Sequence, residues 1–242
     1  MPYSGTLDGI VAAPAKPVVE SGRGTLDRQR ILAAAVRLID NEGLKSFTMR
    51  RLGSRLGVEA MALYHYVFGR EDLLDGVVEY LIDELYNDPE VHVADPIWQD
   101  YLVRVAHGVR RIALTHPEVF PLIATRPPAA PWVRPPLRSL RWMESFLDTL
   151  EKCGFSDTAA VAAYRGFSSF LLGHLLLEVS AQGADTSPIE QAAPTRATPA
   201  DLDGYPLLQR LEPQLSEDRS AQEFEESLES LIDRLHVVVT GA

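Results

Sequence analysis

Two tyrosines and a histidine follow one another on one turn of a short predicted helix, at Tyr64, His65 and Tyr66. Their planar rings carry polar tips, so they pack poorly in a core and suit a surface that touches something flat or charged. Arg70 follows shortly afterwards and adds a positive charge. These residue types indicate a binding surface.

The residues that catalysis or metal binding would need are not arranged for either. The six histidines show no metal-ligand spacing, and one cysteine, Cys153, can form neither a disulfide within the chain nor a cysteine pair for zinc. The stretch Gly166–Phe170 resembles a serine-nucleophile turn, but Phe170 replaces the required glycine and the stretch lies inside a predicted helix. We therefore expect no enzyme, no bound metal and no cofactor.

Charge is divided unevenly along the chain. The 242 residues have a net charge of −11, which by itself argues against nucleic acid. Residues 21–70, however, hold nine basic and four acidic side chains, whereas the rest of the chain holds 14 and 30. Chance fluctuation is one explanation. The other, which we favour, is a small basic head on an acidic body, because a basic head suits nucleic acid.

Helical periodicity runs through most of the chain and no segment alternates like a strand, which predicts an all-α fold. Residues 1–22 are rich in glycine, proline and alanine without any period, so we expect a disordered arm. No apolar stretch is long enough to cross a membrane. Beyond residue 70, the apolar spacing predicts helices over residues 71–86, 98–115, 118–124, 137–152, 157–180 and 221–239.

The segment before residue 70 has the pattern of a helix-turn-helix. A first helix is capped by Thr25 or Asp27 and ends at Gly43; a short helix follows the N-cap Thr48 and ends at Gly57. A third helix is expected over residues 59–67. Two short helices joined by a tight turn behind a longer one are typical of DNA-binding domains.

We therefore divide the chain into two folded parts. Residues 23–70, called the head below, are predicted to bind DNA. Residues 71–242, called the body, are predicted to form a helical ligand-binding and dimerisation domain. Residues 181–206, rich in proline, glycine, alanine and threonine, are predicted to be a flexible loop within it.

The predicted helix 157–180 carries two different stripes. One contains only small side chains, which allow close approach of another helix: Ala159, Ala162, Gly166, Ser169 and Gly173. The final helix offers an apolar stripe of Phe224, Leu228, Leu231, Leu235 and Val238. Two such helices from each of two chains would form a four-helix homodimer interface. The alternative is that both stripes pack within one chain.

The second stripe of helix 157–180 is bulky and mostly aromatic. It comprises Tyr164, Phe167, Phe170, His174 and Leu177, and the preceding helix offers Trp142 and Phe146 to face it. Aromatic walls with a few polar tips can enclose a small molecule. A plain hydrophobic core is the alternative interpretation of the same spacing.

The chain resembles the tetracycline-repressor (TetR) family of transcription regulators over roughly residues 25–240. The DNA-binding domain of that family is matched by ILAAAVRLIDNEG, FTMRRLGSRLGVEAMALYHYV and REDLLDGV. The ligand domain of the tetracycline repressors is matched by WQDYL, TRP, CGF and FLLG, in that order. The resemblance implies a helix-turn-helix head, a helical ligand-binding body and no enzyme activity.

For the head, the resemblance assigns a recognition helix that carries Ala60, Met61 and Ala62 towards base edges. Tyr64, His65 and Tyr66 would lie along the groove wall with their polar tips on phosphates, while Leu63 and Val67 are structural. An alternative for Tyr64 is partial core filling. The remaining DNA contacts of the family match Thr48, Met49 and Arg50 at the start of the preceding helix, and Arg70 at the start of the next helix.

For the body, the resemblance adds Tyr86, Val105, Val109 and Arg126 to the ligand-binding residues. The tetracycline repressors hold a magnesium–drug chelate through a histidine three residues before the threonine of Thr-Arg-Pro. Here Leu122 or Pro121 stands at that place. The pocket is therefore expected to be more apolar, and its ligand to be a hydrophobic compound without a metal.

The resulting hypothesis is a cytoplasmic homodimeric repressor that binds a near-palindromic double-stranded DNA operator and is released by a small-molecule effector. Three alternatives remain open at this point. They are a ligand-dependent activator, a non-specific architectural DNA binder, and a small-molecule-binding module without specific operator binding.

Overall fold

The computed structural model describes residues 25–91, 97–127, 139–186, 202 and 204–240. These residues form helices and turns without a strand, so the predicted all-α class is confirmed. The predicted arm, residues 1–22, and much of the predicted loop, residues 187–201, lie outside the described residues.

The head contains four helical elements. They are α1 (Arg28–Glu42), the short 3-10 helix η1 (Leu44–Ser46), α2 (Met49–Leu56) and α3 (Ala60–Leu63). Asp27, one of the two predicted caps of α1, accepts a 2.7 Å hydrogen bond from the Arg30 backbone N–H. Thr48 caps α2 in the same way through the N–H of Arg51 at 3.2 Å.

The turn between α2 and α3 depends on two glycines. Gly57 has φ = 71°, a left-handed conformation that glycine adopts without strain. Gly53 has no space for a side chain, because a Cβ atom there would lie 2.8 Å from the Val58 carbonyl oxygen. The backbones of the two helices therefore meet directly, which fixes α3 on α2.

The third helix is shorter than the spacing predicted. It ends at Leu63 instead of continuing to Val67, and Tyr64, His65 and Tyr66 form a turn. The turn is closed by hydrogen bonds from the N–H groups of Tyr66 and Val67 to the Leu63 carbonyl, at 2.9 and 3.1 Å. The three rings therefore stand on a hydrogen-bonded turn, pinned at both ends by the buried Leu63 and Val67.

Helix α4 (Arg70–Tyr86) runs from the head into the body. Its first half packs against α1, where Gly76 lies so close that a Cβ atom would be 2.9 Å from atoms of Arg28 and Leu32. Its second half contacts the body through Ile82 and Leu85. A shift of α4 would therefore move the head relative to the body.

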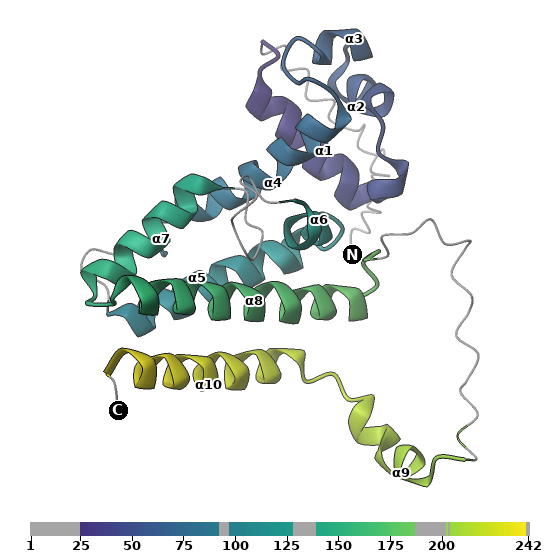
Figure 1. Cartoon of the computed structure of the whole chain (residues 1–242). Coiled ribbons are helices and arrows are strands. Elements are labelled where there is room, and N and C mark those ends of the chain that lie inside the picture. Colours follow the sequence, from purple (N-terminus) through teal and green to yellow (C-terminus); the bar gives the residue numbers. More distant parts are fainter. Residues whose placement is uncertain (1–24, 92–96, 128–138, 187–201, 203, 241–242) are drawn as a thin grey trace, which may run out of the picture.

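The body is built around α8 (Asp157–Ala181), which begins at the N-cap Ser156. Figure 1 shows α10 (Ser220–Thr240) along one side of α8 and α7 (Leu140–Lys152) on the other, while α5 (Trp98–Thr115) contacts both α8 and α10. The short α6 (Phe120–Thr125) contacts both α8 and α4. Helix α8 is long and apolar enough to span a membrane, but 44% of its most apolar window is buried, as befits the central helix of a bundle.

Helix α9 (Pro206–Leu215) follows the expected loop and was not predicted. None of its residues is buried, and it stands apart from the body (Figure 1). Leu207, Leu208 and Leu215 are exposed on it. The helix therefore has an apolar surface that its own chain does not cover.

Candidate functional site

The exposed side of α3 and the turn after it carries most of the residues predicted to contact DNA. Met61 is exposed, as are all three ring residues that follow α3. Ala60 and Ala62 are half-buried, and their methyl groups extend only a short way from the helix backbone. Tyr64 is 46% exposed, so a large part of the residue is available to a ligand. The alternative, that Tyr64 fills the core, applies only to its buried part.

The neighbouring helix α2 contributes one clear correction. Thr48 and Arg50 are exposed at its start, as expected, but Met49 between them is buried with 9% of its surface accessible. Thr48 is the extended N-cap, and Met49 and Arg50 are the first two residues of the helix. Successive helical side chains point about 100° apart, so Met49 can face inward while Arg50 faces solvent. The side chain of Met49 is part of the core of the head and does not reach its surface.

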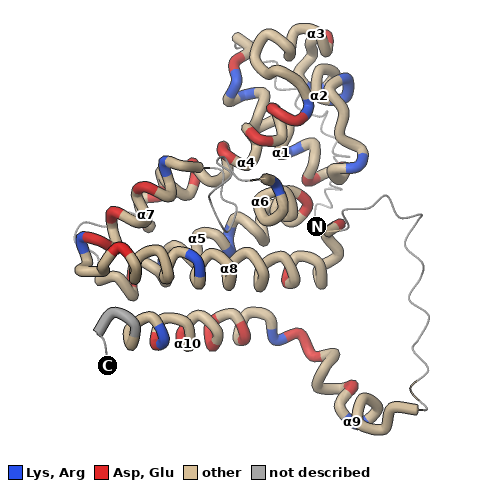
Figure 2. The backbone as a smooth tube through the Cα atoms, viewed as in Figure 1, with Lys and Arg blue, Asp and Glu red and all other residues tan. Residues whose placement is uncertain are grey.

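The arginines of the head differ in their partners. Arg51 and Arg55 both pair with the Glu42 carboxylate, and their hydrogen bonds and charges, Arg55 foremost, lower the pKa of Glu42. Arg70 pairs with Glu71 at 3.2 Å. Arg50 is exposed and makes no ion pair with any residue that the structure describes. Figure 2 shows basic residues on α2, and both basic and acidic residues on helices of the body such as α7, α8 and α10.

In the body, the aromatic residues form a core cluster around Phe146. Its ring lies 5.1 Å from that of Trp142, 5.7 Å from Phe167 and 6.0 Å from Tyr164, measured between centroids. All four side chains are buried. Burial raises the pKa of Tyr164 to about 12, an effect that the nearby Ser168 hydroxyl partly offsets. The cluster is therefore apolar and neutral at physiological pH.

The predicted aromatic face of α8 divides into two. Phe170 and His174 do not join Phe146 but pack against Phe224 of α10, at centroid distances of 5.8 and 5.4 Å. Each step of three residues falls about 60° short of a full helical turn, so two such steps from Tyr164 to Phe170 rotate the side chain by about 120°. The prediction that Phe170 and His174 share a pocket with Trp142 is wrong.

A small apolar cavity of about 20 Å³ lies between α4, α5, α6, α7 and α8. Its wall is formed by Ile82, Leu85, Val109, Ile123, Trp142, Ser168, Leu171 and Leu172. Val109 and Trp142 were predicted to bind ligand, whereas the buried Val105 and Phe167 lie outside this wall. The volume holds no more than a water molecule, so a larger ligand needs the surrounding helices to separate.

Two other predicted ligand residues are engaged elsewhere. The guanidinium of Arg126 forms ion pairs with Asp75 at 2.6 Å and Glu71 at 3.0 Å, both in the first half of α4, and lowers the pKa of Glu71. The ring of Tyr86 is covered by the guanidinium of Arg141, 3.8 Å from the ring centroid. Arg126 therefore ties α6 to α4 and is not a wall of the cavity.

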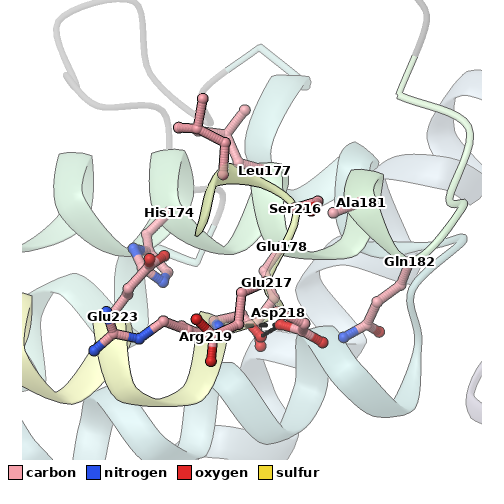
Figure 3. A pocket seen from close by; sticks show the side chains of 12 residues that line it. His174, Leu177, Glu178, Ala181, Gln182, Ser216, Glu217, Asp218, Arg219 and Glu223 are labelled. Atoms are coloured by element: carbon pink, nitrogen blue, oxygen red, sulfur yellow. Dashed lines mark hydrogen bonds between the residues drawn. The ribbon is translucent and has the colours of Figure 1, made fainter. Parts of the chain in front are cut away.

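A larger groove of about 500 Å³ opens between the end of α8 and the segment that joins α9 to α10. Figure 3 shows polar and charged side chains facing one another across it, among them Gln182, Asp218 and Glu223. Glu178 is buried beneath it and pairs with Arg110 at 2.6 Å, which raises the pKa of Arg110. This acidic lining suits a hydrophobic ligand poorly, so the apolar cavity is the better candidate.

The predicted dimer stripes also receive different environments. On α8, Ala162, Ser169 and Gly173 are exposed, Gly166 is half-buried and Ala159 is buried. On α10, Leu228 and Leu235 are buried against α5 and α8 of the same chain, while Leu231 is half-buried near Gly166. The assignment of Leu228 and Leu235 to a contact between chains is wrong, because α10 uses that stripe to close its own body.

Three further residues escaped the sequence analysis. Ser168 is buried without a hydrogen bond among the described residues, Glu178 is a buried acid, and Phe68 is fully exposed. The period of α8 could have placed Ser168 beside Leu171 on the inner face. Neither a lone glutamate in an apolar helix nor a phenylalanine beside a glycine carries a comparable signal.

Two family models match the chain. One, described as bacterial regulatory proteins of the tetR family, matches residues 31–77, which comprise most of the head and the first half of α4. The other, described as the tetracyclin repressor-like C-terminal domain, matches residues 94–239. The two matches follow the two structural units, except that the first includes part of α4.

Relatives of known type are similar over most of their length. An HTH-type transcriptional regulator from Saccharopolyspora erythraea is 29% identical over 183 residues, which are 76% of this chain and 73% of the relative. The tetracycline repressor protein class A from transposon 1721 of Escherichia coli is 28% identical over 210 residues, covering 87% and 90%.

Solved structures extend the similarity to the fold. A possible TetR-family transcriptional regulator from Streptomyces coelicolor A3(2) superposes with a TM-score of 0.68 at 28% identity, covering 88% of this chain and all of that one. The S. coelicolor TetR-family protein ActR, solved in complex with (S)-DNPA, gives a TM-score of 0.63 at 25% identity, covering 90% and 98%.

Proposed function

Because the chain belongs to the TetR family of bacterial regulatory proteins, and so is a transcriptional regulator and not an enzyme, we propose that it is a homodimeric repressor released from a near-palindromic operator by a small hydrophobic effector. The protein would act in the cytoplasm, because that is where the DNA of a bacterium lies. Each part of the proposal is supported by a different region of the structure.

The exposed DNA-facing surface is the observation that carries the proposal. The outer side of α2, α3 and the turn after α3 carries the rings of Tyr64, His65 and Tyr66, and at the start of α2 the exposed Thr48 and Arg50. Arg50 forms no ion pair with another described residue. The buried Leu63 holds that turn in place. Polar tips and a cation can contact phosphates and base edges together, as helix-turn-helix proteins require.

Dimerisation is supported by two surfaces that the chain leaves open. Ala162, Ser169 and Gly173 form an exposed small face on α8, against which a helix of a second copy can lie closely. Helix α9 also has leucines that stay exposed among the residues that the structure describes. Two heads joined through the bodies would enter successive major grooves, roughly 34–36 Å apart.

The effector site is proposed at the apolar cavity. Leu122 and Pro121, which occupy the place of the metal-binding histidine of the tetracycline repressors, are buried and offer no metal ligand. The wall consists of aliphatic and aromatic side chains with one hydroxyl. ActR, a relative by fold, was solved with the small molecule (S)-DNPA. A hydrophobic compound that enlarges the cavity fits these observations, without a metal.

The coupling between the effector and DNA is proposed to run through α6 and α4. Ile123 of α6 and Ile82 of α4 both line the cavity, so a ligand there pushes on both helices. Arg126 ties the end of α6 to Asp75 near the start of α4. Movement of α4 would change the spacing of the two heads, and a coupling of about 1–3 kcal/mol suffices for release.

The test is a gel shift of the full chain with the DNA upstream of its own coding sequence, alongside light scattering to measure the mass of the particle. We expect a dimer that binds this DNA more tightly than a scrambled duplex of equal length. Equal binding to both duplexes would remove the sequence-specific part of the proposal. A transcription assay with the same DNA distinguishes repression from activation.

A further inference from the structure

Phe68 is the most exposed large apolar side chain that the structure describes. Its accessible fraction is 99%, compared with 73% for Met61 and 40% for Tyr66 on the same head. Isolated exposed hydrophobic residues are common on proteins and need no explanation by themselves. Phe68 differs because of how firmly its backbone is held and what surrounds it.

The backbone around Phe68 is fixed on both sides. The preceding residue, Val67, is buried with 1% of its surface accessible, and the Phe68 N–H donates a 2.8 Å hydrogen bond to the Asp72 carboxylate. Gly69 follows with φ = 139°, and its carbonyl accepts the N–H of Leu73 at 3.0 Å, which starts α4. The ring is therefore presented outward by an ordered turn and not by a frayed end.

The surroundings of Phe68 are those of the proposed DNA surface. The turn lies directly after α3, at the end of the molecule opposite α10 (Figure 1). Tyr66 stands two residues before it and Arg70 two residues after it, both exposed. The guanidinium of Arg70 lies over the Phe47 ring, 5.9 Å from its centroid, which holds the cation close to the turn.

We propose, on the basis of the function proposed above, that Phe68 packs against deoxyribose rings of the operator backbone beside the phosphate that Arg70 contacts. Sugars and phosphates alternate along a DNA strand, so an apolar ring next to a cation matches the apolar and anionic parts of one strand. Phe68 thereby contributes affinity by burying apolar surface, without neutralising a phosphate.

This role predicts a separable signature. Contacts that neutralise phosphates release counterions, so their loss changes the slope of log affinity against log salt concentration. Loss of an apolar contact leaves that slope unchanged and lowers affinity equally at all salt concentrations. Since the side chain of Phe68 is 99% exposed in the part of the chain that the structure describes, we expect its removal to leave the folding of the head intact.

The experiment compares the full-length protein with Phe68→Ala and Phe68→Lys by fluorescence anisotropy on the operator, at several salt concentrations. We expect Phe68→Ala to bind roughly tenfold more weakly, with an unchanged salt slope and thermal midpoint. Phe68→Lys is expected to recover part of the affinity at low salt but with a steeper slope. Ile97→Ala, an exposed apolar position on the body, is the matched control and is expected to change neither quantity.

The outcomes separate this inference from the function on which it rests. If the unsubstituted protein shows no preference for the operator, the proposed function fails before any variant is measured. If it binds the operator but Phe68→Ala binds equally well, or loses affinity only through weaker self-association in light scattering, the role of Phe68 is refuted and the repressor proposal stands.

Discussion

Arg50 and Arg51 are neighbours in α2 with opposite surroundings. Arg51 shares the Glu42 carboxylate with Arg55, whereas Arg50 is exposed without an ion pair among the described residues. We therefore expect Arg50→Ala to weaken operator binding by about 1–3 kcal/mol, because its charge is available to DNA. Arg51→Ala, the matched control, is expected to change affinity by less than about 0.5 kcal/mol. Anisotropy titrations measure the operator affinity of both variants. Equal losses of affinity would show that Arg50 contributes no more to DNA binding than Arg51.

Ser168 is a polar residue that is only 3% exposed, and its hydroxyl makes no hydrogen bond of normal geometry among the described residues, although it lies near enough to the Tyr164 hydroxyl to lower the pKa of that group. Other helical hydroxyls, such as that of Ser230, bond to the carbonyl four residues before them, at 2.8 Å for Ser230. An unsatisfied buried hydroxyl costs free energy that its removal recovers. Ser168→Ala is therefore expected to be neutral or to stabilise the apo protein by up to about 1 kcal/mol, measured by denaturant unfolding.

The Ser168 experiment also bears on the effector. If the hydroxyl is kept for a ligand, Ser168→Ala will weaken the response to a hydrophobic effector that carries one hydrogen-bonding group, measured in a thermal-shift screen, while leaving the apo protein at least as stable. Ser230→Ala is the control, because its hydroxyl is already satisfied. A large destabilisation by Ser168→Ala would mean instead that the hydroxyl has a structural partner.

At the scale of helices, the crossing of α4 over α5 is closely fitted. A Cβ atom on Gly108 of α5 would lie 2.4 Å from the Cδ1 of Leu85 in α4, and Leu85 is only 2% exposed. Because the buried leucine has little room to turn aside, we expect Gly108→Ala to cost about 1–3 kcal/mol in denaturant unfolding. Adding Leu85→Ala should recover part of the loss. If the two substitutions are simply additive, the helices do not meet at this point.

Helix positions were predictable where the apolar period is long and both ends carry caps. The predicted helix 98–115 has the observed bounds of α5, and the predicted helix 157–180 begins at the first residue of α8, behind the N-cap Ser156. The end of α3 was not predictable, because a hydrogen-bonded turn keeps the helical spacing of its side chains for several more residues. Helix α9 escaped because proline and polar residues surround it and no core defines its face.

The functional residues show a similar division. The exposure of the predicted contact residues on α2 and α3 could be inferred from the order of caps and turns. Met49 is the exception, because a shift of one residue along the helix decides whether its side chain faces the core. The stripe of α10 was visible in the sequence, but a stripe does not say which chain will cover it. The pocket was harder still, because Tyr164 and Phe170 share a spacing and yet face different helices.

Across the whole molecule, two of the described contacts between ionisable side chains join the head to parts of the body other than α4. His116, at the end of α5, contacts the Asp40 carboxylate of α1 through its Nδ1 at 2.7 Å. Lys45 of η1 contacts Asp185, just after α8, at 2.5 Å. The hydrogen bond and charge of Asp40, together with the charge of Glu84, raise the pKa of His116 above its ordinary value of 6.5. The first contact therefore responds to pH.

The raised pKa fixes the direction of that response. A histidine with a higher pKa in the folded state contributes its full stabilisation below its unfolded pKa, and loses it as pH rises through the folded value. We therefore expect the stability difference between the unsubstituted protein and His116→Gln to be largest below about pH 6.5 and to shrink at higher pH. Asp40→Asn should show the same profile. Denaturant unfolding from pH 5 to 9 measures both variants. A difference for His116→Gln that does not change with pH would mean that the charge of the imidazole does not hold the head to the body. A neutral ring can still donate its Nδ1–H to the Asp40 carboxylate, but only the protonated ring adds an attraction between charges.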